Sequence, residues 1–536
     1  MAATDTRQFD PESVLLPEAD KGHIRRRYVG LTLGAVLGVV TYFAMPASAA
    51  GLAADLVGGD VYFPPGPLKL AAGLTVLMAI WWMTEAVPLA ATALLPVAVV
   101  PIYRAFAQHA DCGAAATAEE WCSSTAFTTV ASQYASGTIF LFMGGFLLAL
   151  SMQRWNLHKR IALAVVAAVG TKPTRLVAGF MIASGFITMW VSNTATAVMM
   201  LPLGVSILTL VGRLSKEAGS TRSNFGTSLM LGIAYASSIG SLSTLIGTPP
   251  NTFLKGYMEQ EFGVTISFSK WMMAGLPLSI VFLAITWFIL TKVLFKPEIK
   301  DIPGGRDLIR SERAALGPWS AGEKLVAIVF AAAAVCWVAF PLIPPLADLG
   351  VKDEYIAMAV GVVLFLLPAE PRKGIMVLDW NTAKHMPWDV LLLFGGGLAL
   401  SGLITDTGLA NWIGDRAKGL GSIPVFLAVV VVTMLIIFLT ELTSNTATAA
   451  LFVPIMGGVA VGLGLDPMML AVPVALASTC AFMLPVATPP NAIAYGSGYV
   501  TIGSMVRGGL WLNLIGIVLI TTCMYTLFIP LLGIGG

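Results

Sequence analysis

Two short polar sequences each occur twice in this chain, every time inside a long apolar stretch. Ser-Asn-Thr-Ala-Thr-Ala lies at Ser192–Ala197 and Ser444–Ala449, and Thr-Pro-Pro-Asn lies at Thr248–Asn251 and Thr488–Asn491. Hydroxyl and amide oxygens suit hard cations such as sodium, whereas free N–H groups at a helix start attract carboxylates. Asn carries both a donor and an acceptor, so the Asn of each Ser-Asn-Thr could contact a cation and an anion together. This combination is typical of a symporter for small anions.

The repeats favour a functional site over a purely structural role. A single Ser-Asn-Thr in a membrane helix commonly makes interhelical hydrogen bonds, and a single Pro-Pro commonly kinks a helix. Here both sequences recur in the same order. Two adjacent prolines cannot continue a helix. Broken helices at membrane depth survive only when buried in protein or lining a polar cavity.

Composition places the chain among polytopic membrane proteins. Of its 536 residues 57% are hydrophobic and 11% are charged, against about 25% charged in soluble domains. The net charge of +2 says nothing about nucleic acid, but no basic patch with interleaved aromatics appears outside short loops, so no nucleic-acid partner is expected. Four dispersed histidines and the lack of Cys-x-x-Cys give no metal site. Cys112 and Cys122 share one predicted loop, where either a disulfide or two free thiols would be ordinary.

Charge bias orients the apolar runs. Arg25–Arg27 precede the first run and predict a cytoplasmic N-terminus. Basic residues flank 175–213 on both sides, so this stretch must enter and return as a re-entrant hairpin, and 423–463 is its counterpart from outside. The spans expected beside these hairpins are 31–49, two within 68–101 interrupted at 84–88, 138–152, 228–258 broken at 247–250, 271–294, 326–344, 356–367, 390–404, 468–499 broken at 487–490, and a last span ending outside at Gly536.

The predicted fold is therefore an all-α polytopic membrane protein with about eleven transmembrane helices and two opposed hairpins in an inverted repeat. Phe142, Gly144 and Gly145 recur as Phe394, Gly396 and Gly397, displaced by the same 252 positions as the two Ser-Asn-Thr sequences. Both glycine pairs favour close helix packing over ligand contact. The expected divisions are a cytoplasmic tail (1–28), a first repeat (29–295), a cytoplasmic linker (296–324) and a second repeat (325–536).

These sequences resemble the divalent anion/sodium symporter family. The features that carry the resemblance are the two Ser-Asn-Thr motifs, Trp82–Pro88, Thr440–Thr446 and Phe482–Asn491, which together reach across most of the chain. The resemblance implies a homodimer with a fixed scaffold domain. It also implies a transport domain, made of hairpins and broken helices, that slides as an elevator.

The resemblance also implies the site residues. The first sodium site would use Thr188, Ser192, Asn193 and Gly247, and the second would use Thr440, Thr443, Asn445 and Ala487. Some relatives carry Ser at the position of Thr188 and Ala at that of Thr443, which leaves side-chain or backbone coordination open there. Substrate carboxylates would meet Asn193, Thr194, Thr248, Ser444, Asn445, Thr446, Thr488 and Pro489.

Two acidic residues in or near apolar runs, Glu85 and Glu441, are further functional candidates. Glu441 lies three residues before Ser444 and could anchor the site from behind, cap a helix, or take a direct part in coupling. The absence of Lys and Arg from the motifs implies that a dianion there depends on helix ends and on co-transported sodium.

The expected activity is sodium-coupled symport of C4 dicarboxylates such as succinate, malate or fumarate, in a bacterial inner membrane. A sodium-independent dicarboxylate exchanger, or a sodium-coupled carrier of citrate or sulfate, remains open, as do the stoichiometry and the direction. A proton-coupled or arsenite carrier would more naturally need an acid in the motif itself. An intramembrane hydrolase would need a zinc motif or paired aspartates. A channel would need a ring of pore-lining charge.

Overall fold

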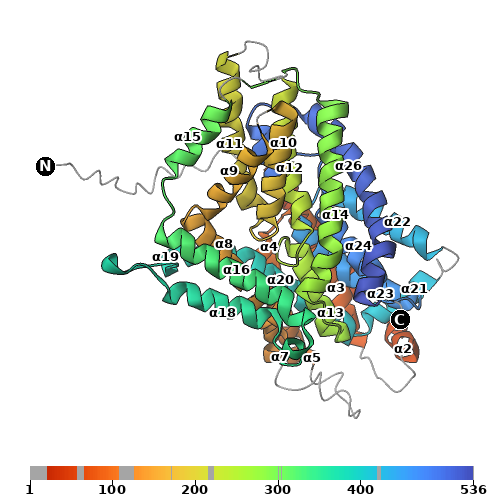
Figure 1. The fold of residues 1–536 in the computed structure, drawn as a ribbon. Coiled ribbons are helices and arrows are strands. Elements are labelled where there is room, and N and C mark those ends of the chain that lie inside the picture. The colour runs from red at the N-terminus through yellow and green to blue at the C-terminus, as the bar shows by residue number, and fades with distance from the viewer. Residues whose placement is uncertain are drawn as a thin grey trace.

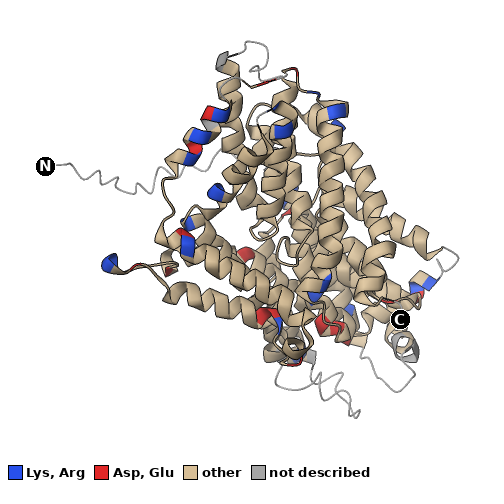
Figure 2. Ribbon diagram, viewed as in Figure 1, with Lys and Arg blue, Asp and Glu red and all other residues tan. Residues whose placement is uncertain are grey.

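The computed structural model describes residues 21–56, 65–107, 126–170, 172–214, 223–299, 301–302, 305–418 and 424–534. Cys112 and Cys122 lie outside these ranges. Almost every element is an α-helix, and ten helices in the described ranges are long and apolar enough to cross a membrane. The predicted all-α polytopic class is therefore confirmed. Most Lys, Arg, Asp and Glu residues gather toward the two ends of the bundle, and the belt between them is nearly uncharged (Figure 2).

The first half of the chain runs from α1 to η3, and its helices cross between the two ends of the bundle (Figure 1). Helix α1 begins at Lys21, inside the expected tail, and α3 ends at Thr84, where the predicted interruption occurs. The elements are α1 (Lys21–Ala44), α2 (Ser48–Leu56), α3 (Pro65–Thr84), α4 (Leu89–Thr92), α5 (Leu95–Ala107), α7 (Ala126–Ser132), η2 (Gln133–Ala135), α8 (Gly137–Arg154), α9 (Leu157–Val169), α10 (Pro173–Thr188), α11 (Asn193–Leu214), α12 (Asn224–Ser241), α13 (Pro249–Phe262), α14 (Phe268–Phe288) and η3 (Ile289–Leu294).

The second half begins with an amphipathic helix, α15, inside the expected linker, and includes a two-stranded antiparallel hairpin. Its elements are α15 (Gly305–Ala315), α16 (Ala321–Leu342), α17 (Pro344–Ala347), α18 (Asp353–Leu366), β1 (Pro368–Glu370), η4 (Pro371–Lys373), β2 (Ile375–Met376), α19 (Trp380–Ala383), α20 (Trp388–Asp406), α21 (Leu409–Lys418), α22 (Val425–Thr440), α23 (Asn445–Gly462), α24 (Met468–Ser478), α25 (Pro489–Gly496), α26 (Ile502–Cys523), η5 (Met524–Phe528) and α27 (Ile529–Leu532).

The repeat extends beyond the motifs. Helices α9 and α21 begin at Leu157 and Leu409, and α11 and α23 begin at Asn193 and Asn445, all with the 252-residue displacement. Both α9 and α21 follow directly after a long apolar helix and pack on the hairpin of their own half, α9 on α10 and α21 on α23. Neither short helix is expected from the sequence, because each carries charged residues that hide its apolar face.

The glycine pairs allow helices to touch, as predicted. A Cβ atom on Gly144 would lie 2.4 Å from the carbonyl oxygen of Ala357 in α18, and one on Gly396 would lie 2.1 Å from that of Ala93 beside α4. Only a residue without a side chain permits such an approach. These two contacts fix α8 and α20 to the helices around them.

Candidate substrate and sodium site

Two helical hairpins present their turns to one another. In the first, α10 ends at Thr188 and α11 begins at Asn193, and in the second, α22 ends at Thr440 and α23 begins at Asn445. The Ser192 hydroxyl accepts a hydrogen bond from the backbone N–H of Ala195 at 3.3 Å, so it caps the returning helix. Each Ser-Asn-Thr therefore forms the start of a helix at the tip of a hairpin.

Two broken helices complete the arrangement. Helix α12 stops at Ser241 and α13 starts at Pro249, while α24 stops at Ser478 and α25 starts at Pro489. The prolines stand at the first helical positions, where their missing N–H costs nothing. The hydroxyls of Thr248 and Thr479 lie 3.3 Å apart, so the two breaks contact one another across the repeat.

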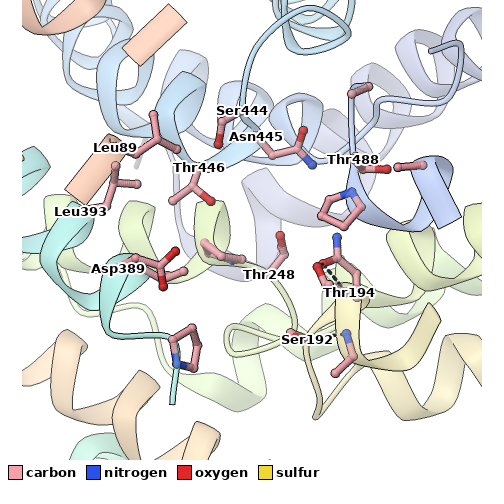
Figure 3. A pocket seen from close by; sticks show the side chains of 18 of the residues that line it. Leu89, Ser192, Thr194, Thr248, Asp389, Leu393, Ser444, Asn445, Thr446 and Thr488 are labelled. Atoms are coloured by element: carbon pink, nitrogen blue, oxygen red, sulfur yellow. Dashed lines mark hydrogen bonds between the residues drawn. The ribbon is translucent and has the colours of Figure 1, made fainter. Parts of the chain in front are cut away.

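A cavity of about 960 Å³ opens between these four tips. In Figure 3 the labelled side chains of Ser444, Asn445 and Thr446 lie across from those of Ser192 and Thr194, with Thr248 between them and Thr488 to the right of Asn445. All the predicted substrate residues line this cavity: Asn193, Thr194, Thr248, Ser444, Asn445, Thr446, Thr488 and Pro489.

Most predicted sodium ligands line the same cavity, and two do not. Those in its wall are Ser192, Asn193, Gly247, Thr443, Asn445 and Ala487. Thr188 and Thr440 are the last residues of their helices and are fully buried behind the tips. They stand on the protein side of each tip, where a cation would be enclosed.

Four helix N-termini face the cavity, whose inner wall carries no Lys or Arg. Helices α11, α13, α23 and α25 all begin with a residue that lines it, namely Asn193, Pro249, Asn445 and Pro489. Each helix start carries roughly half a positive charge, so four of them offset a dianion. The first arms α10 and α22 instead end at the tips and supply carbonyl oxygens, which favour a cation.

The oxygen ligands at the second tip lie close together. The hydroxyl of Thr440 is 2.9 Å from Oδ1 of Asn445 and 2.9 Å from the carbonyl oxygen of Ser478. At the first tip the buried hydroxyl of Thr188 has no hydrogen-bond partner within the described ranges, and Oδ1 of Asn193 accepts from the N–H of Thr194 at 2.8 Å. Neutral oxygens in this arrangement fit a hard cation. Ser478 is a functional candidate that the motifs do not reveal.

Glu441 anchors the second break from behind the cavity. Its carboxylate accepts hydrogen bonds from the backbone N–H groups of Phe482, Met483 and Leu484 at 2.7 to 3.1 Å, and from Nδ2 of Asn513 at 2.8 Å. The residue is 3% exposed and does not line the cavity. The anchor is therefore the role that the geometry supports. In the first hairpin the equivalent position is Met189, so this anchor belongs to the second half alone.

The mouth of the cavity is polar and charged. Its lining residues come from the first turns of α1, the residue after α3, the end of α8, the connection between α19 and α20, and the start of α20, namely Arg26, Glu85, Gln153, His385 and Asp389. Asp389 is one of the labelled residues at the side of the cavity in Figure 3. Of these residues the sequence singles out Glu85 alone, and it misses the other four because they are scattered and belong to no motif.

A polytopic helical bundle whose opposed hairpins and broken helices enclose one polar cavity defines a membrane transporter. Comparison with known proteins gives the family. A model of the sodium:sulfate symporter transmembrane region matches residues 68–534, and the chain belongs to this family. The family consists of transporters, so the protein is not an enzyme.

Curated relatives cover nearly the whole chain. The sodium-dependent dicarboxylate transporter SdcS of Staphylococcus saprophyticus is 43% identical over 513 residues, which is 94% of this chain and 92% of that protein. SdcS of Staphylococcus aureus strain USA300 is 42% identical over 467 residues, 86% of each chain. The resemblance stated from the motifs is thereby confirmed.

Solved structures share the fold. The YdaH transporter of Alcanivorax borkumensis superimposes with a TM-score of 0.55 over 81% of this chain and 97% of its own. MtrF of Neisseria gonorrhoeae, described with a class of antimetabolite efflux pumps, superimposes with a TM-score of 0.52 over 83% of this chain and 96% of its own. Each is 13% identical to this chain, so the likeness concerns the fold alone.

Proposed function

We propose that this protein transports C4 dicarboxylates, such as succinate, malate and fumarate, by sodium-coupled symport. The observation that carries the proposal is the convergence of four helix starts and two sets of neutral oxygen ligands on one cavity. The helix starts match two carboxylates, and the oxygens match sodium. Relatives named as sodium-dependent dicarboxylate transporters, at 42–43% identity, support the same cargo and the same coupling ion.

Each residue set has its own role in the proposal. Thr188, Ser192, Asn193 and Gly247 bind one sodium ion, and Thr440, Thr443, Asn445 and Ala487 bind another. The substrate carboxylates are held by Asn193, Thr194, Thr248, Ser444, Asn445, Thr446, Thr488 and Pro489. Because no cationic side chain stands at the inner wall, sodium binds before the dianion. Two sodium ions would make transport electroneutral, whereas a third would couple it to the membrane potential at about 2.3 kcal/mol per 100 mV.

The proposed movement is an elevator. Within the repeats 29–295 and 325–536, hairpins and broken helices form a transport domain that slides against the remaining helices of a homodimer. The cavity mouth is lined by Arg26, Glu85 and Gln153, from segments expected on the cytoplasmic side. The conformation described here is therefore interpreted as inward-facing. The proposed setting is a cell membrane. The N-terminal tail 1–28 and the linker 296–324 lie in the cytoplasm, and the C-terminus lies outside.

The test is uptake of labelled succinate into proteoliposomes under an inward sodium gradient or an equal potassium gradient. Wild-type protein is compared with Asn193→Ala and Asn445→Ala. Uptake only with sodium, lost in both variants, is the expected result.

Two other outcomes would replace this proposal. Equal uptake in potassium that requires dicarboxylate inside the vesicles would make the protein an exchanger. Sodium-driven uptake of citrate or sulfate in place of succinate would change the cargo, and the matching family is itself named for sulfate.

A further inference from the structure

The asparagine of each Thr-Pro-Pro-Asn makes the same contacts in both halves. Nδ2 of Asn251 donates to the carbonyl oxygen of Thr244 at 2.9 Å and reaches that of Ser241 at 3.5 Å. Nδ2 of Asn491 donates to the carbonyl oxygen of Leu484 at 3.1 Å and to that of Ala481 at 3.0 Å. In both cases the acceptors lie seven and ten residues upstream, and both asparagines are fully buried.

Each asparagine thereby holds one turn of the break. The backbone N–H of Gly247 donates to the hydroxyl of Thr244 at 3.0 Å, and that of Ala487 donates to the carbonyl oxygen of Leu484 at 3.2 Å. The turns 244–247 and 484–487 are thus equivalent. Their first residues are bound by the asparagines, and their last residues line the cavity.

The breaks need such a donor. Where a helix stops, its last carbonyl groups lose their N–H partners, and prolines farther along offer none. Buried carbonyls without a donor cost free energy in a membrane interior. A side-chain amide replaces the missing donors and at the same time fixes the direction in which the turn points. In both asparagines Oδ1 is buried without a hydrogen-bond partner in the described part of the chain, so the contact uses the donor alone.

We propose that Asn251 and Asn491 are the positioning residues of the two sodium sites, because each holds the turn that carries Gly247 or Ala487. The proposal rests on the proposed function. Neither asparagine contacts the cavity, so neither touches substrate or cation directly. Each acts by directing the backbone oxygens of the turn that precedes it in sequence toward the tip of the hairpin.

The test uses Asn251→Asp and Asn491→Asp, which keep the side-chain shape and remove the amide donor. Two quantities are measured in proteoliposomes: the sodium concentration for half-maximal succinate uptake, and the KM for succinate at saturating sodium. Thr433→Val is the matched control, because it removes a buried hydroxyl bond, to the Val429 carbonyl at 2.7 Å, that stays within helix α22 and involves no residue of either break.

Loss of even one of the hydrogen bonds that each amide makes predicts a rise in the half-maximal sodium concentration of about fivefold or more in each variant, with KM for succinate nearly unchanged. The control should match wild type. If a variant transports too slowly, the rise in melting temperature on adding sodium in detergent gives the same comparison.

Variants with a lower Vmax or melting temperature but an unchanged response to sodium would overturn the positioning role. Uptake by wild-type protein that does not depend on sodium would instead overturn the proposed function. The wild-type measurement therefore distinguishes a failure of the proposed function from a failure of the positioning role.

Discussion

Glu441 has no acidic counterpart in the first half, where Met189 stands at the equivalent position. Four donors make five hydrogen bonds to its buried carboxylate, and four of these bonds come from the backbone of the second break. Replacing it with Gln turns one acceptor into an N–H₂ group that faces N–H donors. Hydrogen bonds to a charged group are worth about 1.5 to 3 kcal/mol each. We expect Glu441→Gln to reduce the initial rate of succinate uptake at least tenfold, measured at equal protein content.

Met189 provides the comparison, since it occupies the equivalent position in the first hairpin and is an apolar residue. Met189→Leu keeps both volume and polarity and should transport at nearly the wild-type rate. Wild-type rates in Glu441→Gln would mean that the second break keeps its shape without the carboxylate.

Sequence motifs identify site residues whose side chains are unusual in an apolar run. They do not identify residues whose role depends on the course of the backbone in a loop. The predicted substrate residues stand out because small polar groups recur within apolar runs. Ser478 enters through its backbone carbonyl, and any residue type would supply one. The partners of Asn251 and Asn491 lie within breaks whose course cannot be read from two prolines. Glu441 is visible as a buried acid, but its anchor role follows only from the donors around it.

At the level of helices, Gly396 is one of the positions where an added side chain would collide with the backbone of a neighbouring segment. A Cβ atom there would lie 2.1 Å from the Ala93 carbonyl oxygen, and backbone cannot yield as a flexible side chain does. Gly396→Ala should lower stability by about 1 to 3 kcal/mol through overpacking. Thermal unfolding in detergent would show this as a lower melting temperature.

Gly503 is the matched control for that substitution. It lies in the first turn of α26, and an added Cβ would meet no atom within 4 Å. Gly503→Ala should leave the melting temperature unchanged or raise it, since Ala favours a helix more than Gly does. Equal behaviour of the two alanine variants would contradict the packing argument.

Charge bias and apolar length locate the long helices well, and amphipathic helices poorly. The interruption after Thr84 falls where it is predicted, whereas both breaks lie mainly upstream of their prolines, which begin α13 and α25. Helices α9, α15 and α21 are absent from the predicted spans because their charged residues lower the average hydrophobicity of each segment, although one face is apolar. The common displacement of α9 and α21 was available in the sequence, but only a comparison of the two halves residue by residue would detect it.

On the scale of the whole molecule, a cluster of charges joins α13 to the start of α18. Nζ of Lys255 lies 3.3 Å from Glu259 and 3.6 Å from Glu354, and Lys352 bridges the same two acids. Lys255 is only 1% exposed. Removing one partner of a buried pair costs about 3 to 5 kcal/mol, whereas replacing both is often neutral. Lys255→Met and Glu354→Met should each lower the melting temperature, and the double variant should recover most of the loss.

Additive losses in the double variant would mean that the pair contributes no coupling. The cluster matters for the mechanism because α13 belongs to the proposed transport domain and α18 to the scaffold. An elevator movement must separate these charges once in every cycle.

Movement between the two domains can be tested by a cross-link. A Cβ atom at Gly256 in α13 would lie 3.3 Å from the Cβ of Thr138 in α8, close to the spacing of a disulfide. In a variant without the native cysteines, Thr138→Cys with Gly256→Cys should lose succinate uptake on mild oxidation and regain it on reduction. The control pair, Gly38→Cys in α1 with Leu77→Cys in α3, is equally close at 3.1 Å but joins two scaffold segments. The control variant should transport succinate both after oxidation and after reduction. Full uptake through a completely oxidised first pair would rule out sliding of α13 along α8, because a disulfide holds two Cα atoms within about 7 Å.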